Sequence, residues 1–323
     1  MTQVATKRWK PTPIEIFIAG LAVFLLAQRW LVGLFQAPVW QAGATVFVAI
    51  VVQALPFLVL GVVLSGLITA YVSPAFFERV LPKKPALAVP VAGAAGVLIP
   101  GCECASVPVA GGLMAQGVSP AAALAFLLSS PAINPVVIVS TYVAFPNNHM
   151  MALARLIASL IAAVLMGWAW LAFGKGEWLR IPQRDHLHGD TKFETFWRTA
   201  AHDFLHAGGF LVIGGVTAAI LNVVVPPSWL QAVSDRPLLS IVGLSVLAVV
   251  LCICSEADAF VAASLTQFSL TARLAFLVVG PMVDIKLVAL QAGTFGRQFA
   301  ARFAPVTFVV AMSVASLVGW WLL

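Results

Sequence analysis

The chain has 323 residues, of which 61% are hydrophobic and only 9% are charged, against roughly 45–50% and about 25% in ordinary soluble proteins. This composition excludes a soluble globular enzyme and predicts an all-α polytopic membrane protein with about eight to ten crossings, since about 20 apolar residues span a bilayer as a helix. The net charge of +6 is interpreted as the bias that orients membrane loops, so no nucleic-acid partner is expected.

The N-terminal segment, residues 1–43, is predicted to contain a first transmembrane helix. Basic residues at 7–10 precede an apolar run from Ile14 to about Phe35, and no clear cleavage site follows. We therefore expect a retained helix rather than a removed signal peptide. Because basic clusters flank the hairpin formed by this run and the next, we expect a cytoplasmic N-terminus.

The next segment, residues 44–173, combines two long apolar runs with a broken region. The runs at 44–72 and 150–173 are long enough to span a bilayer. Between them, prolines interrupt the apolar sequence near residues 100, 120 and 129–135. Proline breaks or kinks helices, and broken helices at membrane depth must be buried in protein or line a wet cavity. Such breaks indicate a binding site in transporters.

A polar stretch at 174–198, with five basic residues among four acids, is predicted to be a cytoplasmic linker. Beyond it, residues 199–323 repeat the order of the first half. A long run at 204–225 is followed by a broken region at 238–295 and a final helix at about 303–323.

Residues 44–173 and 199–323 are interpreted as two homologous permease repeats. A shift of 150 residues places Cys102 on Cys252, Cys104 on Cys254, and one Leu-Ala-Phe-Leu segment on another. Lys and Arg in the connecting loops favour opposite orientations of the halves, hence an inverted repeat, because only one loop of each equivalent pair is rich in basic residues. A parallel repeat is the alternative. Each broken region then holds three short helices, or one helix with re-entrant hairpins.

All four cysteines belong to two C-x-C pairs, Cys102 with Cys104 and Cys252 with Cys254. If a pseudo-two-fold axis relates the halves, the pairs approach each other where broken helices meet. Four convergent sulfur ligands suit trivalent arsenic or antimony, Cu(I) or Zn(II). The alternative is that cysteine is a small residue that allows close helix packing.

Ionisable groups within membrane segments are costly and indicate function. Glu103 lies between the first two cysteines, Glu256 and Asp258 follow the second pair, and Asp284 and Lys286 lie farther along. We expect these five side chains to line a polar cavity, with Glu256, Asp258 and Lys286 as proton-coupling candidates. The alternative is that they extend to the interface from helix ends.

Three further polar residues, Ser129, Ser130 and Asn134, surround the prolines of the first broken region, and Asn134 aligns with Asp284. They are candidates for contacting substrate or for satisfying backbone groups freed by proline. The sequence shows no nucleotide-binding lysine loop or common hydrolase motif, so we expect neither an enzyme nor a cofactor.

Several motifs together are specific: P-G-C-E-C-A-S-V-P-V at 100–109, G-V-S-P at 117–120, L-S-S-P-A-I-N-P at 128–135, C-I-C-S-E-A-D at 252–258 and G-P-M-V-D-I-K at 280–286. With them the chain resembles the predicted permeases of the ArsP/YraQ-like family from about residue 44 onward. The resemblance implies an inner-membrane permease and, in the arsenic-resistance branch, an efflux carrier for trivalent organoarsenicals such as methylarsenite.

We therefore predict a secondary transporter that exports a thiophilic solute by alternating access. Its partners are the transported solute and the lipid bilayer, and a homo-oligomer is left open. The alternatives are a permease for another anion or a divalent metal, a thiol oxidoreductase acting between the C-x-C pairs, and a membrane subunit or scaffold of another complex.

Overall fold

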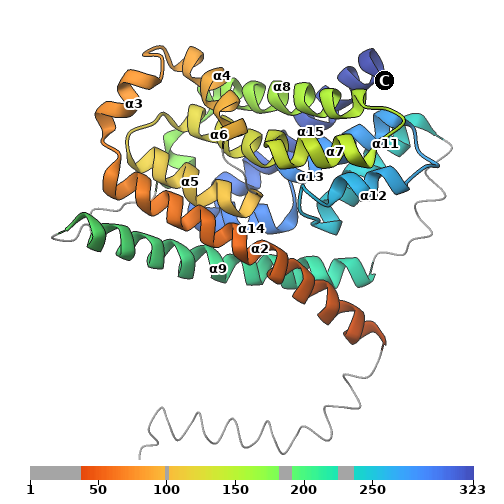
Figure 1. The fold of residues 1–323 in the computed structure, drawn as a ribbon, viewed down its shortest axis with the longest axis horizontal. Coiled ribbons are helices and arrows are strands. Elements are labelled where there is room, and N and C mark those ends of the chain that lie inside the picture. Colours follow the sequence, from red (N-terminus) through yellow and green to blue (C-terminus); the bar gives the residue numbers. More distant parts are fainter. Residues whose placement is uncertain (1–37, 99–101, 182–190, 225–235) are drawn as a thin grey trace, which may run out of the picture. The chain divides into compact units, whose positions relative to one another are not determined.

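The computed structural model describes residues 38–98, 102–181, 191–224 and 236–323, in which it contains helices and no strand (Figure 1). The predicted helix at 14–35 lies outside these ranges. The chain divides into two compact units, residues 1–45 and residues 46–323. The packing and the site described below lie within the second unit. In the described ranges, six helices are long and apolar enough to cross a membrane and two apolar helices are shorter. The predicted all-α membrane architecture is confirmed, with fewer long helices than the eight to ten crossings expected.

The first half contains seven α-helices in the described ranges: α2 (Pro38–Tyr71), α3 (Pro74–Val80), α4 (Pro85–Ala95, extended by the 3₁₀ turn Gly96–Leu98), α5 (Glu103–Ala115), α6 (Pro120–Ile133), α7 (Pro135–Ala144) and α8 (Met150–Phe173). The second half contains α9 (Lys192–Val224), α11 (Pro237–Leu251), α12 (Asp258–Ser264), α13 (Leu270–Met282), α14 (Ile285–Thr294) and α15 (Arg297–Leu322). Six of these helices start with a proline, whose missing N–H is not needed in the first turn.

The predicted break at 129–135 is confirmed and lies at Asn134, because Pro131 is accommodated inside α6. Asn134 Oδ1 accepts a hydrogen bond from Val137 N at 3.0 Å and so caps α7. The aligned residue Asp284 acts in the same way on α14, where its Oδ1 accepts from Leu287 N at 2.6 Å. In each half, therefore, a polar side chain restarts the helix and satisfies a backbone donor that would otherwise be exposed to apolar surroundings.

The order of elements in the first half recurs in the second. Helix α6 packs against α4 and α8, and its counterpart α13 packs against α11 and α15. The shorter helices cross between halves, because α5 packs against α14 while α12 packs against α7. The contact between α5 and α14 is thus the counterpart of the contact between α12 and α7.

Equivalent long helices run in opposite directions. Along α2 from residue 46 onward, Ile50 lies beside Gly215 of α9, whereas Ser65, nearer the end of α2, bonds to Asp203, nearer the start of α9. Figure 1 shows the two helices alongside each other. Helix α8 also runs against its counterpart α15, because Trp170 near the end of α8 packs on Phe299 near the start of α15.

The broken helices are the best buried of the candidate membrane spans. In the most apolar part of the α6–α7 and α13–α14 spans, 78% and 83% of residues are buried, against 28–44% in the other four spans. Helices α8, α9 and α15 contact the interrupted helices, which helps to keep lipid away from the interruptions, as an unpaired backbone at membrane depth requires.

Two predicted boundaries differ from the structure. Helix α9 starts at Lys192, inside the predicted linker 174–198, because Thr191 Oγ1 accepts from Glu194 N at 3.1 Å and Arg198 forms an ion pair with Glu194 one turn away. The last helix starts at Arg297 rather than near residue 303.

The close contact between α2 and α5 gives a first prediction. A Cβ atom on Gly61 would lie 2.5 Å from the backbone Cα of Ala105, so Gly61→Ala should destabilise the protein by about 1–3 kcal/mol through overpacking. The measurement is the melting temperature of the detergent-solubilised protein. The control is Gly209→Ala on α9, where an added Cβ meets nothing within 4 Å. Equal melting temperatures of the two variants would contradict the contact.

Candidate functional site

The starts of α5 and α14, one from each half, meet at a buried ion pair. Lys286 in the first turn of α14 is fully buried, and Glu103, the first residue of α5, is 1% exposed. Lys286 Nζ donates to Glu103 Oε1 and lies 3.4 Å from Asp284 Oδ2. Glu103 Oε2 is buried and has no hydrogen-bond partner among the residues that the structure describes. Because a buried charge must be paired, this lysine ties together carboxylates from both halves.

Three of the four predicted cysteines gather around this ion pair. One ligand atom each from Cys102, Glu103 and Cys254 lies within 4.8 Å of the others. Cys254 Sγ is 3.8 Å from Lys286 Nζ, and the thiol of Cys104 contacts that of Cys102. All three side chains are buried and no disulfide joins them. The structure thus brings together sulfur atoms from both halves.

The fourth cysteine, Cys252, is not among these clustered donor atoms, although its thiol contacts the backbone N–H groups of Ile285 and Lys286 at the start of α14. It ends α11 in the left-handed conformation, with φ 51° and ψ 38°, and its Sγ bonds to Val249 O at 3.2 Å. Its side chain packs in a small cluster with Ile50 and Ala218. Two of the four predicted sulfur atoms therefore lie in the donor group, with Cys104 beside Cys102 and Cys252 against the first turn of α14.

A second buried ion pair also joins the two halves. Arg155 of α8 is fully buried and donates to both carboxylate oxygens of Asp258, the first residue of α12, at 2.9 and 2.8 Å. It also donates to Thr141 Oγ1 at 2.9 Å and to Ser255 O at 3.3 Å. Such bidentate pairing is strong and directional. Arg155 is not among the residues predicted from the sequence, although a lone charge within an apolar run is a sufficient signal.

The remaining predicted acid, Glu256, lies within electrostatic reach of both pairs. Its Oε2 atom is buried without a hydrogen-bond partner. Asp258 and Lys286, the other proton-coupling candidates, are instead held in ion pairs.

The polar side chains of the first break have local partners. Ser129 Oγ donates to Phe126 O at 3.2 Å, and Asn134 Nδ2 donates to Ser130 O at 3.4 Å. Ser130 is buried beside the Gly96 backbone. Ser129 and Asn134 thus bond to backbone carbonyl groups of α6, and the role of all three residues toward a substrate stays a prediction. None of these hydrogen bonds joins the three residues to the thiols.

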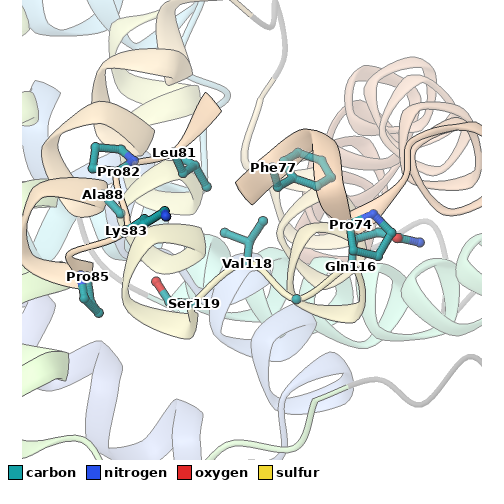
Figure 2. A pocket seen from close by; sticks show the side chains of 11 residues that line it. Pro74, Phe77, Leu81, Pro82, Lys83, Pro85, Ala88, Gln116, Val118 and Ser119 are labelled. Carbon is teal, nitrogen blue, oxygen red and sulfur yellow. The ribbon is translucent and has the colours of Figure 1, made fainter. Parts of the chain in front are cut away.

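A separate pocket of about 400 Å³ lies at the other end of α5, next to α3 and the start of α4 (Figure 2). Phe77, Lys83, Val118 and Ser119 are among the residues that line it. None of the predicted site residues lines this pocket. With α5 spanning 13 residues, or about 20 Å, the pocket is distinct from the thiol group at the start of α5.

Comparisons with known proteins agree with a membrane permease. The model of a family described as "Predicted permease" (ArsP_1) matches residues 40–319. The chain belongs to this family. It is also 37% identical over 281 residues to "UPF0718 protein YcgR" of Bacillus subtilis strain 168, covering 84% of this chain and 94% of the relative. No solved structure matches the chain.

A second relative is the "Putative two-component membrane permease complex subunit" of Streptococcus mutans serotype c. It is 31% identical over 283 residues, which cover 85% of this chain and 94% of the relative. The family and the six apolar helices together identify a multi-pass membrane protein of the permease class.

The Arg155 pair gives a prediction about stability. Arg155→Ala leaves Asp258 buried without its partner, which should cost about 3–5 kcal/mol. Arg198→Ala removes the same side chain from an exposed pair with Glu194 and should cost less than about 1 kcal/mol. Thermal melting of both variants in detergent measures the difference. Similar losses would show that the Arg155 pair is not buried as described.

Convergence of the halves can be tested by cross-linking. In a Cys104→Ser/Cys252→Ser background, with a protease site inserted between α8 and α9, the thiol oxidant diamide should join Cys102 to Cys254. After protease treatment the halves then migrate together on a non-reducing gel and separate when reduced. The same chain carrying Cys254→Ser is the control. If the two halves also separate on the non-reducing gel in the chain that keeps Cys254, the result would contradict the proximity of Cys102 and Cys254.

Proposed function

We propose that this permease exports a thiophilic solute, a trivalent organoarsenical such as methylarsenite, across the inner membrane. The observation that carries the proposal is the meeting of Cys102 and Cys254, one from each half, in a fully buried site. Soft thiol ligands favour soft, thiophilic species. A site shared between the two halves of a transporter is also where alternating access acts.

The chemistry of capture balances without any change of charge. Two thiols and methylarsenite form two As–S bonds and release two waters, with each thiol proton leaving in a water and arsenic remaining trivalent. No net charge enters the site, so the ion pair between Lys286 and Glu103 keeps its balance. Reversal by water on the other side of the membrane releases the solute.

We propose that the two halves form an inverted repeat and that one half rocks against the other. The opposite directions of α2 and α9, and of α8 and α15, support this arrangement, because equivalent helices then cross the membrane in opposite senses. The bias of basic residues in the loops supports a cytoplasmic N-terminus. Proton coupling through Glu256, Asp258 or Lys286 stays a prediction.

The charge of the site speaks against an anionic solute, the alternative raised by the sequence. Lys286 and Arg155 are already paired with Glu103 and Asp258, so neither base is free to bind an anion. An anion entering this low-dielectric region would therefore meet no unpaired positive charge from these two bases. A neutral arsenical needs no such charge.

The test is uptake of methylarsenite by everted membrane vesicles, with and without a proton gradient. We expect accumulation by the native protein and at least a tenfold loss in Cys102→Ser and Cys254→Ser. Cys252→Ser should retain more uptake than either of these variants, because the Cys252 thiol is not among the clustered donor atoms. Absence of uptake by the native protein would refute the organoarsenical. Uptake unaffected by Cys102→Ser and Cys254→Ser would refute the thiol site.

A further inference from the structure

A charged group already occupies the proposed site. Lys286 Nζ lies among Glu103 of the first half and Asp284 and Cys254 of the second half, where the two halves meet. Glu103 Oε2 still lacks a hydrogen-bond partner, although the residue is 1% exposed. The lysine thus provides one positive charge where carboxylate and thiol donors converge, and one donor atom of Glu103 is left over.

We propose that this site also binds a soft divalent cation, such as Zn²⁺ or Cd²⁺, through Cys102, Cys254 and Glu103, in competition with the ammonium group of Lys286. The inference rests on the proposed function, because it uses the same side chains, and it adds a class of ligand. Two sulfurs and a carboxylate oxygen are a ligand set that suits Zn²⁺, and Cys104 beside Cys102 is available as a fourth.

The geometry is compatible with such an ion. Zinc holds sulfur at about 2.3 Å and carboxylate oxygen at about 2.0–2.2 Å. Donor atoms within 4.8 Å of one another therefore surround the ion after small side-chain rotations. Binding forms two metal–sulfur bonds and releases the two thiol protons to solvent. The cation brings two positive charges and two protons leave, so the total charge of the site is unchanged.

Lys286 gives the site a property that a simple thiol pair lacks. Its ammonium repels an incoming cation and holds the Glu103 carboxylate that the cation needs. It has no comparable effect on neutral methylarsenite, which needs only the sulfurs. Removing the charge of Lys286 should therefore increase affinity for the cation and leave binding of methylarsenite little changed.

The experiment is titration of the detergent-purified full chain with Cd²⁺, followed by the ultraviolet absorption of cadmium–thiolate bonds. We expect one Cd²⁺ per chain, loss of binding in Cys102→Ser and Cys254→Ser, and retention in Cys252→Ser. Glu103→Gln should weaken binding at least about tenfold through loss of a charged ligand, and Lys286→Gln should strengthen it by a similar factor.

The outcomes separate this inference from the proposed function. No saturable Cd²⁺ binding, or binding that survives Cys102→Ser and Cys254→Ser, would overturn the cation site while thiol-dependent transport of methylarsenite could still stand. Cadmium binding at the thiols without transport of methylarsenite would support the cation site and refute the organoarsenical. If Lys286→Gln does not fold, the Cd²⁺ affinity of Glu103→Gln is compared with that of Cys252→Ser instead. Unchanged affinity in Glu103→Gln would refute the carboxylate ligand.

Discussion

The need to keep unpaired backbone away from lipid governs the arrangement of this protein. Helices interrupted at Asn134 and at Asp284 leave polar groups without helical partners, and a bilayer offers no water to replace them. The interrupted spans are therefore the most deeply buried, with the continuous helices around them. The same side chains that mark the interruptions also cap the next helices. A chemically reactive interior follows from this constraint, since the interruptions are where charged and thiol groups can be held.

Two buried ion pairs connect the halves at related places. Lys286 with Glu103 joins α14 to α5, and Arg155 with Asp258 joins α8 to α12 near α7. Buried pairs add little net stability compared with apolar residues, but breaking one is costly. Their value here lies in fixing which segments meet. They place the thiols of Cys102 and Cys254 together although these residues lie in different halves.

Much of the fold could be predicted from composition, proline positions and the internal repeat. The helix at 150–173 and the break near Asn134 are local features, and the structure has them where the sequence indicates. Partners could not be predicted in this way, because Lys286 and Glu103 are 183 positions apart. Nor does the sequence reveal that Cys252 adopts a positive φ, which L-residues rarely do. Arg155 was predictable in principle, as a charge within an apolar helix.

The two ion pairs are reciprocal, and this has a consequence for how the protein is made. The first half supplies the acid of one pair and the base of the other, and the second half supplies the complements. The first half alone would leave Glu103 and Arg155 without these partners, and the second half alone would leave Asp258 without Arg155, while Lys286 would keep Asp284. Each half thus depends on the other to neutralise charge in its interior, which ties completion of the chain to stable insertion in the membrane.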